Sequence, residues 1–314
     1  MKKILLVGGG GFVGRHLYDE LAKRGHQVFA ADLPGTTLRN RNILPLDLRD
    51  IVSIQKVLEQ VRPEVVFHLA AQSMVTLSWE KPAMTFDINV TGAVNMFMET
   101  AQILPECRFI FIGSGEEYGI GSDMTHPFTE ETFCKPQNPY AISKFSAGML
   151  LEKSADRMGT DFIHLRPFNH YGPGQRTGFA VSDFCSQIAA IEAGMQPPEM
   201  QIGCLTAQRD FLFIQDVINA YCLFAECREH RHSIYNICSG IAYPIQHILD
   251  ILTSFSSKKI KITIDPTRFR QPVNPALYAS AERLKDEFNW ENQTSLSDGL
   301  LKTLNYWREN TAIK

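Results

Sequence analysis

Residues 3–14 read KILLVGGGGFVG, an apolar run that ends in four glycines and leads into a helical pattern. Gly8, Gly11 and Gly14 have the spacing G-x-x-G-x-x-G. A tight turn that lets the backbone approach a pyrophosphate leaves no room for Cβ atoms, and the following helix N-terminus offers free N–H donors. Asp32 ends the next apolar run, where a carboxylate can accept hydrogen bonds from an adenosine ribose. The stretch predicts a dinucleotide-binding turn, with a merely flexible loop as the alternative.

The cofactor choice depends on Asp32. A 2′-phosphate at this position would meet a like charge, so Asp32 favours NAD over NADP. Arg39 and Arg41 weaken that preference, because either side chain could fold over a phosphate. The sequence therefore leaves both NAD(H) and NADP(H) as candidate cofactors.

Continuous apolar runs alternate with longer amphipathic segments in the first half of the chain. The runs are expected to be strands buried on both faces, as in a parallel sheet: Lys3–Val7, Val28–Ala31, Val65–Leu69, Phe109–Ile112, Phe162–Leu165 and Ile234–Ile237. Helices are expected at Val13–Arg24, Ile51–Gln60, Ala83–Ile103 and Ala141–Met158. This alternation predicts an α/β fold with a Rossmann-type doubly wound parallel sheet.

The pattern changes after residue 168, where Gly172-Pro173-Gly174 indicates a loop. The later segments are expected to be helices at Phe179–Gly194, Gln215–Cys227, Ile245–Ser254 and Leu296–Arg308, a strand at Lys259–Asp265 and a loop at Arg268–Pro275. We expect an NAD(P)-binding domain at residues 1–168 that also receives about 211–238. Residues 169–210 and 239–314 are expected to form a smaller α/β substrate-binding domain.

The composition is that of an ordinary globular protein, with 44% hydrophobic and 21% charged residues among 314. A formal net charge of −3 gives no electrostatic basis for binding nucleic acid or membranes. The apolar run Ile4–Val7 is too short for a signal peptide, and no apolar stretch is long enough to span a membrane. Seven cysteines without a C-x-x-C pair and nine scattered histidines favour a cytoplasmic protein without a metal site.

Tyr140 and Lys144 stand four residues apart, on one face of a predicted helix that begins near Pro139. A lysine ammonium near a phenol should lower the pKa of Tyr140 toward the range of an acid–base catalyst. Taken alone, the pair is better explained as a solvated helix face. Ser114, however, follows the strand Phe109–Ile112 and should lie at the carboxyl end of the sheet, where such folds bind ligands. Its hydroxyl could hydrogen-bond a carbonyl oxygen there.

Further motifs occur along essentially the whole chain. They are residues 47–50 (DLRD), 68–73 (HLAAQS), 89–92 (NVTG), 113–119 (GSGEEYG), 139–144 (PYAISK), 166–169 (RPFN) and 209–211 (RDF). Together with the glycine turn, they resemble the extended short-chain dehydrogenase/reductase family acting on nucleotide sugars. Segments 112–119, 168–175 and 236–240 most resemble the GDP-4-keto-6-deoxy-D-mannose reductases, which form GDP-D-rhamnose. GDP-mannose 4,6-dehydratases are near relatives of these reductases.

The resemblance implies that Ser114, Tyr140 and Lys144 form a catalytic triad for hydride transfer at carbon 4 of the sugar. Tyr140 would donate the proton, Ser114 would hold the developing alkoxide, and Lys144 would bond the nicotinamide ribose. Glu116 matches a glutamate that abstracts a proton in the dehydratases, but the reductases keep it too. Gly115 stands where glucose-type dehydratases have an aspartate. A reductase is favoured, and a dehydratase or an epimerase stays an alternative.

The resemblance also implies the ligand contacts. The expected cofactor-binding residues are Gly8, Gly11, Phe12, Val13, Asp32, Asp47, Leu48, Leu69, Ala70, Ala71, Tyr140, Lys144 and Pro167. Substrate contacts are implied for Ser73, Ser114, Glu116, Asn169, Arg209 and Arg270. The two arginines suit a diphosphate, because guanidinium groups form forked, charge-assisted hydrogen bonds with phosphates. Val273 departs from the family pattern, in which a glutamate contacts a ribose.

The expected substrate is a GDP-linked 4-keto-6-deoxyhexose. The helices Ala83–Ile103 and Ala141–Met158 resemble those that pair into a dimer interface in this family, so a homodimer is expected. The apolar residues Ala147, Met149, Leu150 and Leu151 could equally face their own sheet. A dinucleotide-sensing scaffold without activity is the alternative from a different class. An intact Ser114, Tyr140 and Lys144 set argues against it.

Overall fold

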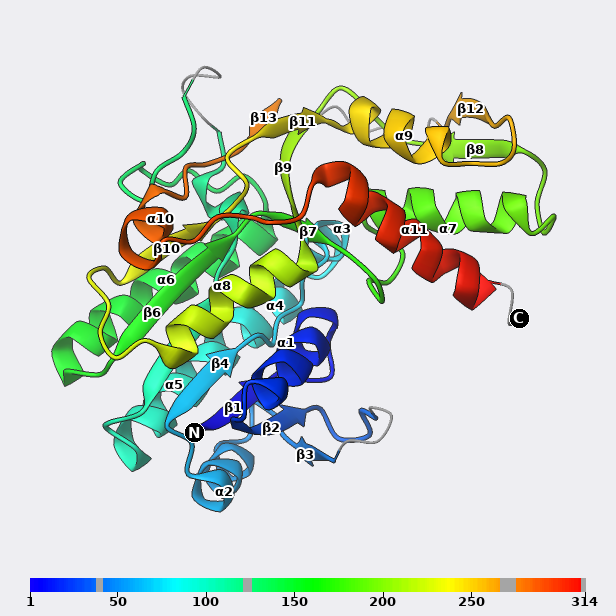
Figure 1. Ribbon diagram of the computed structural model, residues 1–314. Helices are drawn as coiled ribbons and strands as arrows, with labels where there is room; N and C mark the ends of the chain where they lie inside the picture. Colours follow the sequence, from blue (N-terminus) through cyan, green and yellow to red (C-terminus); the bar gives the residue numbers. More distant parts are fainter. Residues whose placement is uncertain (38–41, 121–125, 266–274, 312–314) are drawn as a thin grey trace.

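The computed structural model describes residues 1–37, 42–120, 126–265 and 275–311. Its centre is a seven-stranded sheet in the order β10-β6-β5-β4-β1-β2-β3 (Figure 1), in which all neighbouring strands are parallel. The strands are β1 (Lys3–Val7), β2 (Gln27–Asp32), β3 (Ile43–Pro45), β4 (Val65–His68), β5 (Arg108–Ile112), β6 (Phe162–Pro167) and β10 (Ile234–Ile237). The predicted α/β class with a doubly wound parallel sheet is confirmed.

Helices cover both faces of this sheet. Helices α1 (Phe12–Lys23) and α8 (Ile214–Glu226) pack on one face, and α2 (Ile51–Val61), α5 (Gly92–Ile103) and α6 (Pro139–Met158) pack on the other. Successive residues of β1 point to opposite faces, so Ile4 belongs to the first core and Leu5 to the second. Burial on both faces explains why the strands have continuous apolar sequences.

The strand order reverses at β1, whose two neighbours are β4 and β2. Open α/β sheets bind ligands in the crevice at the carboxyl ends of the strands at such a switch point. The glycine turn follows β1, and residues 69–71 follow β4, so both loops lie at this crevice. The topology places the predicted nucleotide-binding segments together.

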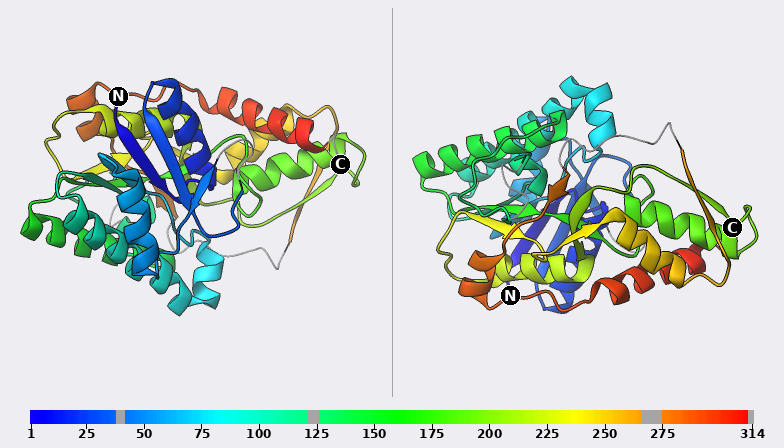
Figure 2. Two further views of the ribbon diagram at one scale, coloured as in Figure 1. Left: turned by 90° about the horizontal axis from the view of Figure 1, so that it is seen from below. Right: turned by 90° about the horizontal axis from the view of Figure 1, so that it is seen from above.

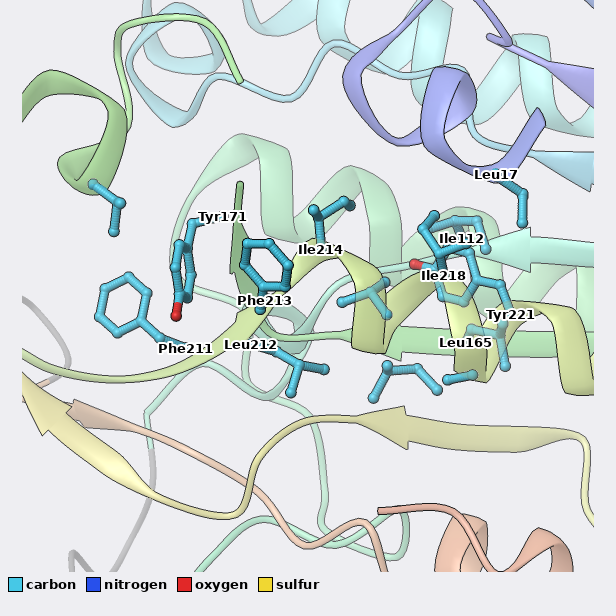
Figure 3. Packing of buried hydrophobic residues seen from close by; sticks show 14 of the residues in the cluster. Leu17, Ile112, Leu165, Tyr171, Phe211, Leu212, Phe213, Ile214, Ile218 and Tyr221 are labelled. Carbon is cyan, nitrogen blue, oxygen red and sulfur yellow. The ribbon is translucent and has the colours of Figure 1, made fainter. Parts of the chain in front are cut away.

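Most of the remaining elements gather to one side of the large sheet (Figures 1 and 2). They are the strands β7 (Asn169–Tyr171), β8 (Glu199–Ile202), β9 (Gln208–Phe213), β11 (Ala242–Pro244), β12 (Lys261–Ile264) and β13 (Ala276–Leu277), with the helices α7 (Ala180–Glu192), α9 (Ile245–Ser254) and α11 (Leu296–Thr311). Helix α10 (Glu282–Phe288) instead lies beside β10, where the rings of Phe288 and Tyr235 have centroids 6.0 Å apart. Strand β9 pairs with β7, β11 and β13, and β8 pairs with β12. The core is continuous between the two parts: Tyr171 packs beside Phe213 with ring centroids 5.8 Å apart, and Ile214 and Tyr221 extend the same cluster toward the large sheet (Figure 3). The exact domain boundaries stay a prediction.

The predicted helix Ala83–Ile103 is confirmed, with a π-helical turn in its middle. The structure runs from α4 (Pro82–Phe86) through a π-helical turn at Asp87–Thr91 into α5, and a further short helix, α3 (Val75–Glu80), precedes them. The side chain of Asn89 in this turn is buried and binds both the N–H and the C=O of Gln72, at Oδ1–N and Nδ2–O distances of 2.8 and 3.1 Å. This inward hydrogen bonding accounts for the local widening of the helix, since π-turns commonly serve such side chains.

Within the described ranges, no helix is both long enough and apolar enough to cross a membrane. The same residues contain no group of three or more His, Cys, Asp or Glu side chains arranged to hold a metal ion.

Candidate active site

The glycine turn, residues 8–14, leaves a hollow between backbone segments, called here the glycine cradle, which Cβ atoms at Gly8 and Gly14 would fill. Gly8 has φ +85°, and a Cβ atom there would lie 2.6 Å from the backbone nitrogen of Ala70. A Cβ at Gly14 would lie 2.7 Å from the carbonyl oxygen of Gly8. Gly11 is the N-cap of α1 and offers no capping side chain, so the first-turn N–H groups of α1 have no side-chain acceptor there. A pyrophosphate fits such a turn, because it brings the acceptors that these donors lack.

The carboxylate of Asp32 lies beside the glycine turn. Its Oδ2 accepts a hydrogen bond from the Gly10 nitrogen at 3.0 Å, and its Oδ1 accepts one from the Leu33 nitrogen at 2.8 Å. The Leu46 nitrogen donates to the Asp32 carbonyl oxygen at 2.8 Å, which brings the segment after β3 to the same edge. Two of the predicted cofactor residues, Asp47 and Leu48, belong to this segment.

Asp47 and Leu48 have well-defined neighbours. The Arg49 guanidinium donates to both carboxylate oxygens of Asp47, at Nε–Oδ1 and Nη2–Oδ2 distances of 3.0 and 2.8 Å, and this pair lowers the pKa of Asp47. Leu48 packs against Gly92 at the start of α5, where a Cβ atom would lie 3.0 Å from the Leu48 Cβ. The segment is therefore held by α5 as well as by β3.

Ser114, Tyr140 and Lys144 meet at the end of β5. Asn138 caps α6 by accepting from the Ala141 nitrogen at 2.8 Å, so Tyr140 and Lys144 stand on the first turns of that helix. The Tyr140 phenol lies within hydrogen-bonding reach of the Ser114 side chain. The Lys144 Nζ donates to the carbonyl oxygen of Ile112 at 2.7 Å and lies 5.0 Å from the centroid of the Phe111 ring.

The electrostatics of Tyr140 differ from the expectation. Burial raises the pKa of Tyr140 to about 12, the hydrogen bond to Ser114 lowers it, and the charges of Glu116 and Glu117 raise it. The predicted lowering by Lys144 is therefore wrong in this structure, because that ammonium is held at the Ile112 carbonyl. Burial also lowers the pKa of Lys144 to about 8. At neutral pH the phenol is protonated and can serve as a proton donor.

Glu116 is tied to the helix that carries Tyr140. Its Oε2 accepts a hydrogen bond from Asn138 Nδ2 at 3.3 Å. Burial lowers the pKa of Arg209 below its usual value, and the nearby Glu116 carboxylate acts in the opposite direction. Glu116 and Arg209, which the sequence assigned to the substrate, therefore lie within electrostatic reach of each other.

Asn169 comes from the strand next to Arg209. It stands opposite Phe211 in the parallel β7–β9 pair, and Arg209 precedes Phe211 on β9. The Nδ2 atom of Asn169 is buried and has no hydrogen-bond partner among the described residues. An unsatisfied buried donor is costly, and a ligand oxygen is the kind of partner that would satisfy it.

The other predicted contact residues have different environments. Pro167 is buried at the end of β6, opposite Ile237 of β10. Ala70 and Ala71 are half-buried beside the glycine turn, whereas Ser73 is exposed. Phe12 stacks on His170, with ring centroids 6.1 Å apart, and so links α1 to the segment after β6. Arg39, Arg41, Arg270 and Val273 lie outside the described residues.

Sequence reasoning assigned no role to Asn89, Asn138 or Glu117. Asn89 bridges Gln72 to Ser143, whose Oγ lies 2.9 Å from the Asn89 Nδ2, and so ties the π-turn to α6. Asn138 could have been found, because an asparagine directly before a proline is a common helix start. Glu117 gave no signal, because two adjacent glutamates do not reveal which one is buried.

The comparisons with known proteins agree with this geometry. The sequence model of the family described as GDP-mannose 4,6 dehydratase matches residues 5–303. The GDP-6-deoxy-D-mannose reductase of Pseudomonas aeruginosa is 31% identical over 98% of this chain and 97% of that protein. The structure of RMD from Pseudomonas aeruginosa complexed with NADPH superposes with a TM-score of 0.85, at 30% identity over 99% of both chains. UDP-glucose 4-epimerase from Thermotoga maritima, solved with UDP-glucose, gives a TM-score of 0.86 at 27% identity, over 98% of this chain and 99% of that one.

The fold, the glycine cradle and the Ser114–Tyr140–Lys144 cluster define an NAD(P)-dependent enzyme that modifies nucleotide sugars. More particularly, the chain belongs to the family described as GDP-mannose 4,6 dehydratase, which confirms the predicted membership of the extended short-chain dehydrogenase/reductases that act on nucleotide sugars.

Proposed function

We propose that this protein reduces the 4-keto group of GDP-4-keto-6-deoxy-D-mannose with NAD(P)H, forming a GDP-6-deoxyhexose, GDP-D-rhamnose. The observation that carries the proposal is the half-buried Tyr140 phenol, which is protonated at neutral pH and lies within hydrogen-bonding reach of the Ser114 side chain. A reductase needs a proton donor beside the carbonyl oxygen, and this phenol meets that requirement. The similarity to the GDP-6-deoxy-D-mannose reductase of Pseudomonas aeruginosa supports the choice of substrate.

The proposed cofactor is NADH or NADPH, and when bound it supplies the hydride. The glycine cradle, including Gly8, Gly11, Phe12 and Val13, would hold the pyrophosphate, and Leu69, Ala70 and Ala71 would line its other side. Asp32 would receive the adenosine ribose, and Asp47 and Leu48 the adenine. Tyr140, Lys144 and Pro167 would contact the nicotinamide end.

The chain's own groups would then act on the substrate. Ser114 orients the 4-keto oxygen, and Tyr140 gives its proton to that oxygen as negative charge develops on it, a step worth about 10²–10⁴-fold in rate. Arg209 and Asn169, with Arg270 and Ser73, are the proposed contacts to the diphosphate and the sugar. Arg209 in particular suits a diphosphate, because its cationic guanidinium is half-buried and can form forked hydrogen bonds.

The second candidate is dehydration of GDP-mannose. Glu116 favours it, because this carboxylate lies close enough to act on Tyr140 and is held by Asn138 at 3.3 Å. A carboxylate beside a keto sugar can remove a neighbouring proton. If the protein is a reductase, Glu116 instead positions a sugar hydroxyl or Ser114.

The deciding experiment incubates the protein with GDP-4-keto-6-deoxymannose and NADH or NADPH and identifies the product by NMR. GDP-D-rhamnose is expected, and the same spectrum separates it from the talose epimer. Recovery of unchanged 4-keto sugar would refute the reductase. A parallel incubation with GDP-mannose and NAD(P)⁺ tests the dehydratase.

Tyr140→Phe tests the proton donor. We expect kcat to fall by about 10²–10⁴-fold, because the substrate oxygen loses its proton source. Tyr221→Phe is the matched control, since it removes a buried hydroxyl that has no hydrogen-bond partner in the described part of the chain. If Tyr140→Phe turns over as fast as the wild type, a group other than Tyr140 donates the proton to the substrate oxygen.

We also propose that two copies of the chain associate through α5 and α6. The structure divides the apolar residues of α6 between two sides: Ala147 and Leu151 are buried in their own core, whereas Met149 and Leu150 are about half exposed. Sedimentation velocity is expected to give a dimer for the wild type and a monomer for Leu150→Asp. A monomeric wild type would refute the proposal.

A further inference from the structure

The inference concerns a second acidic residue, Glu117, which lies directly behind Ser114. Its side chain is completely buried, unlike that of the neighbouring Glu116. Its Oε1 accepts hydrogen bonds from the Ser114 nitrogen at 2.8 Å and from His164 Nε2 at 3.1 Å, and its Oε2 accepts one from Arg166 Nε at 2.9 Å. All the contacts of this carboxylate are therefore with the site or with β6.

Two glycines make room for this cluster. A Cβ atom at Gly113 would lie 2.3 Å from Glu117 Oε1 and 2.2 Å from His164 Nε2. A Cβ atom at Gly148 would lie 2.3 Å from His164 Cε1. Gly113 precedes Ser114, and Gly148 stands one helical turn after Lys144 on α6. The backbone on both sides of the site thus leaves space for buried charges that an apolar core does not need.

The cluster is fixed from behind by β10. Arg166 Nη1 donates to the Tyr118 hydroxyl at 3.1 Å, and that hydroxyl donates to Asn236 Oδ1 at 2.7 Å. The guanidinium also lies 4.9 Å from the centroid of the Tyr118 ring. Every residue in this series of hydrogen bonds is buried. The carboxylate of Glu117 therefore cannot turn away from Ser114 without breaking several hydrogen bonds.

The charges around Lys144 come from three elements. From the turn after β5, Glu117 raises the pKa of Lys144, against the larger lowering by burial. From β4, His68 is neutral, because burial and the charge of Lys144 lower its pKa to about 3. Tyr140, on α6 itself, stays protonated. The geometry places the opposite charge of Glu117 near this ammonium: Lys144 Nζ contacts the Ile112 carbonyl oxygen at 2.7 Å, and Glu117 Oε1 contacts the Ser114 nitrogen, two residues along the same segment, at 2.8 Å.

Glu117 keeps its own charge. Burial would raise its pKa, but His164 and Arg166 on β6 and the hydrogen bond from Ser114 lower it overall. The charge of Glu117 also acts on Cys134, but burial raises the pKa of this thiol to about 11, so the thiol stays neutral. The carboxylate is therefore ionised at neutral pH.

We propose that Glu117 is a positioning residue of this active site, which fixes the backbone of Ser114 and supplies the buried negative charge that balances the Lys144 ammonium. The proposal rests on the proposed function, because it assumes that Ser114 and Lys144 act with Tyr140 on a substrate. A purely structural buried ion pair would hold β6 to the turn without affecting Lys144.

The test measures Lys144 directly. Protein labelled with [ε-¹³C]lysine is titrated by NMR, and the Lys144 signal is assigned by its loss in Lys144→Arg. We expect the wild-type midpoint near pH 8 and a midpoint lower by on the order of one pH unit in Glu117→Gln. That variant keeps an acceptor for the Ser114 nitrogen but carries no charge. An unchanged midpoint would overturn the proposal.

Two further variants keep the test decisive. Glu117→Gln leaves Arg166 unpaired and could unfold, so the double variant Glu117→Gln/Arg166→Met removes both charges, and the same lowered midpoint is expected. Asp161→Asn is the matched control, because it removes a carboxylate paired with an arginine at the opposite end of the sheet. Lys144 should titrate in Asp161→Asn as in the wild type, and a lowered midpoint there would also count against Glu117.

Activity gives the second measurement and separates the two proposals. If the protein reduces the 4-keto sugar, the alkaline limb of its kcat/KM profile should move to lower pH in Glu117→Gln and stay in place in Asp161→Asn. A limb that does not move would contradict the role of Glu117. If the protein leaves that sugar unchanged, the proposed function fails, while the lysine titration still decides whether Glu117 balances Lys144.

Discussion

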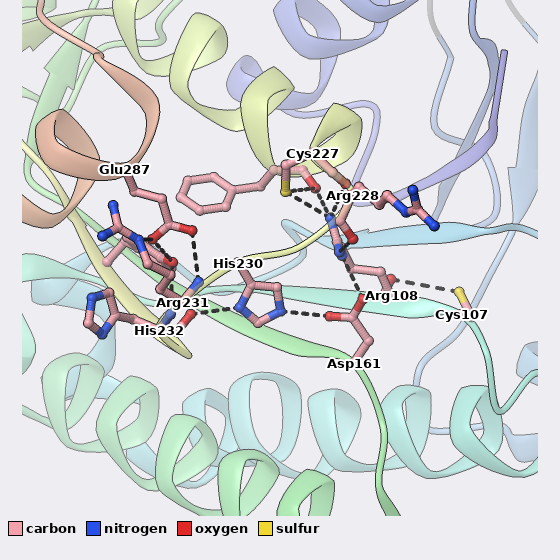
Figure 4. A network of polar contacts seen from close by, with 11 residues as sticks. Cys107, Arg108, Asp161, Cys227, Arg228, His230, Arg231, His232 and Glu287 are labelled. Carbon is pink, nitrogen blue, oxygen red and sulfur yellow. Dashed lines mark hydrogen bonds and ion pairs between the residues drawn. The ribbon is translucent and has the colours of Figure 1, made fainter.

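The two ends of the large sheet differ in whether all their buried polar groups have partners. At the amino end, Arg108 donates to Asp161 (Nε–Oδ2 2.8 Å) and to the carbonyl oxygens of Phe224, Cys227 and Arg228 (Figure 4). His230 Nε2 lies 2.9 Å from the other carboxylate oxygen of Asp161. At the carboxyl end, the ring nitrogens of His68 and the Nδ2 of Asn169 are buried without a partner in the described part of the chain.

This difference separates stability from function. A saturated network such as that of Arg108 contributes to folding, whereas unsatisfied donors and glycine cradles cost stability and leave room for a ligand. Substitutions at Arg108 and in the glycine turn should therefore impair different properties of the protein.

Arg108→Met should be the most damaging substitution at the amino end. It leaves Asp161 with less of its charge compensated and several carbonyl oxygens without a donor, so we expect the free energy of unfolding in urea to fall by about 3 kcal/mol. Arg24→Met is the control, because its partners Glu20 and Glu226 form partly exposed pairs worth under about 1 kcal/mol. Below the unfolding transition, the activity per folded molecule of Arg108→Met should equal that of the wild type. A large loss of kcat in this variant would show that the amino end also contributes to catalysis.

Gly8→Ala should weaken cofactor binding with a smaller effect on stability. Its Cβ would lie 2.6 Å from the Ala70 nitrogen, so the turn must move, and we expect the Kd for NAD(P)H to rise about 10-fold or more, measured by fluorescence titration. Gly25→Ala has the same φ of +85° and nothing within 4 Å of its Cβ, so it carries the backbone strain alone. Equal Kd values for the two variants would show that the cradle does not hold the cofactor.

His230 should make the free energy of unfolding depend on pH, through its hydrogen bond to Asp161 at the amino end of the sheet. Its hydrogen bond to Asp161 raises its pKa, so its stabilising contribution is fully present below the unfolded pKa of about 6.5 and is lost as pH rises through the folded value. Between about pH 6 and 8 we expect the wild type to lose about 1 kcal/mol more stability than His230→Gln. Urea unfolding at several pH values measures this difference. The exposed His247→Gln should behave like the wild type, and parallel curves for wild type and His230→Gln would contradict the prediction.

Asp32→Ala should have the smallest effect. Loss of the carboxylate removes the like charge that a 2′-phosphate would face, so the ratio of kcat/KM for NADPH to that for NADH should rise by about 3-fold. Asp32→Asn keeps an acceptor for the Gly10 nitrogen and isolates the charge. A ratio that both variants leave unchanged would place the adenosine ribose away from Asp32.

The sequence predicted the strands that have a clear apolar pattern and missed the shortest ones. The missed strands include β3 of the large sheet, whereas β12 of a smaller sheet falls within the strand expected at Lys259–Asp265. Strands such as β1 and β10 are buried on both faces, so their apolar runs are continuous and their limits were predicted as observed. Strands such as β3 and β11 have three half-buried or exposed residues each, too few to form a pattern. The short strands owe their structure to the partners that pair with them, which a local pattern does not contain.

The site shows the same limit at the level of side chains. The meeting of Ser114 with Tyr140 follows from a strand end and a helix start, which the sequence predicted. The direction of Lys144 does not follow, because its flexible stem reaches the Ile112 carbonyl from the same helix face that carries Tyr140. The raised pKa of Tyr140 depends on burial, which comes from elements distant in the sequence.

The position of β10 has a consequence for synthesis of the protein. This strand covers the outer edge of β6, yet it is encoded far downstream, after the whole segment that leads from β7 through α8. During translation, β6 therefore emerges from the ribosome with an apolar, unpaired edge, and such edges recruit other strands. Nascent chains that stall before Ile234 should aggregate or be bound by chaperones, and the anchor that Asn236 gives to Tyr118 forms only after that point.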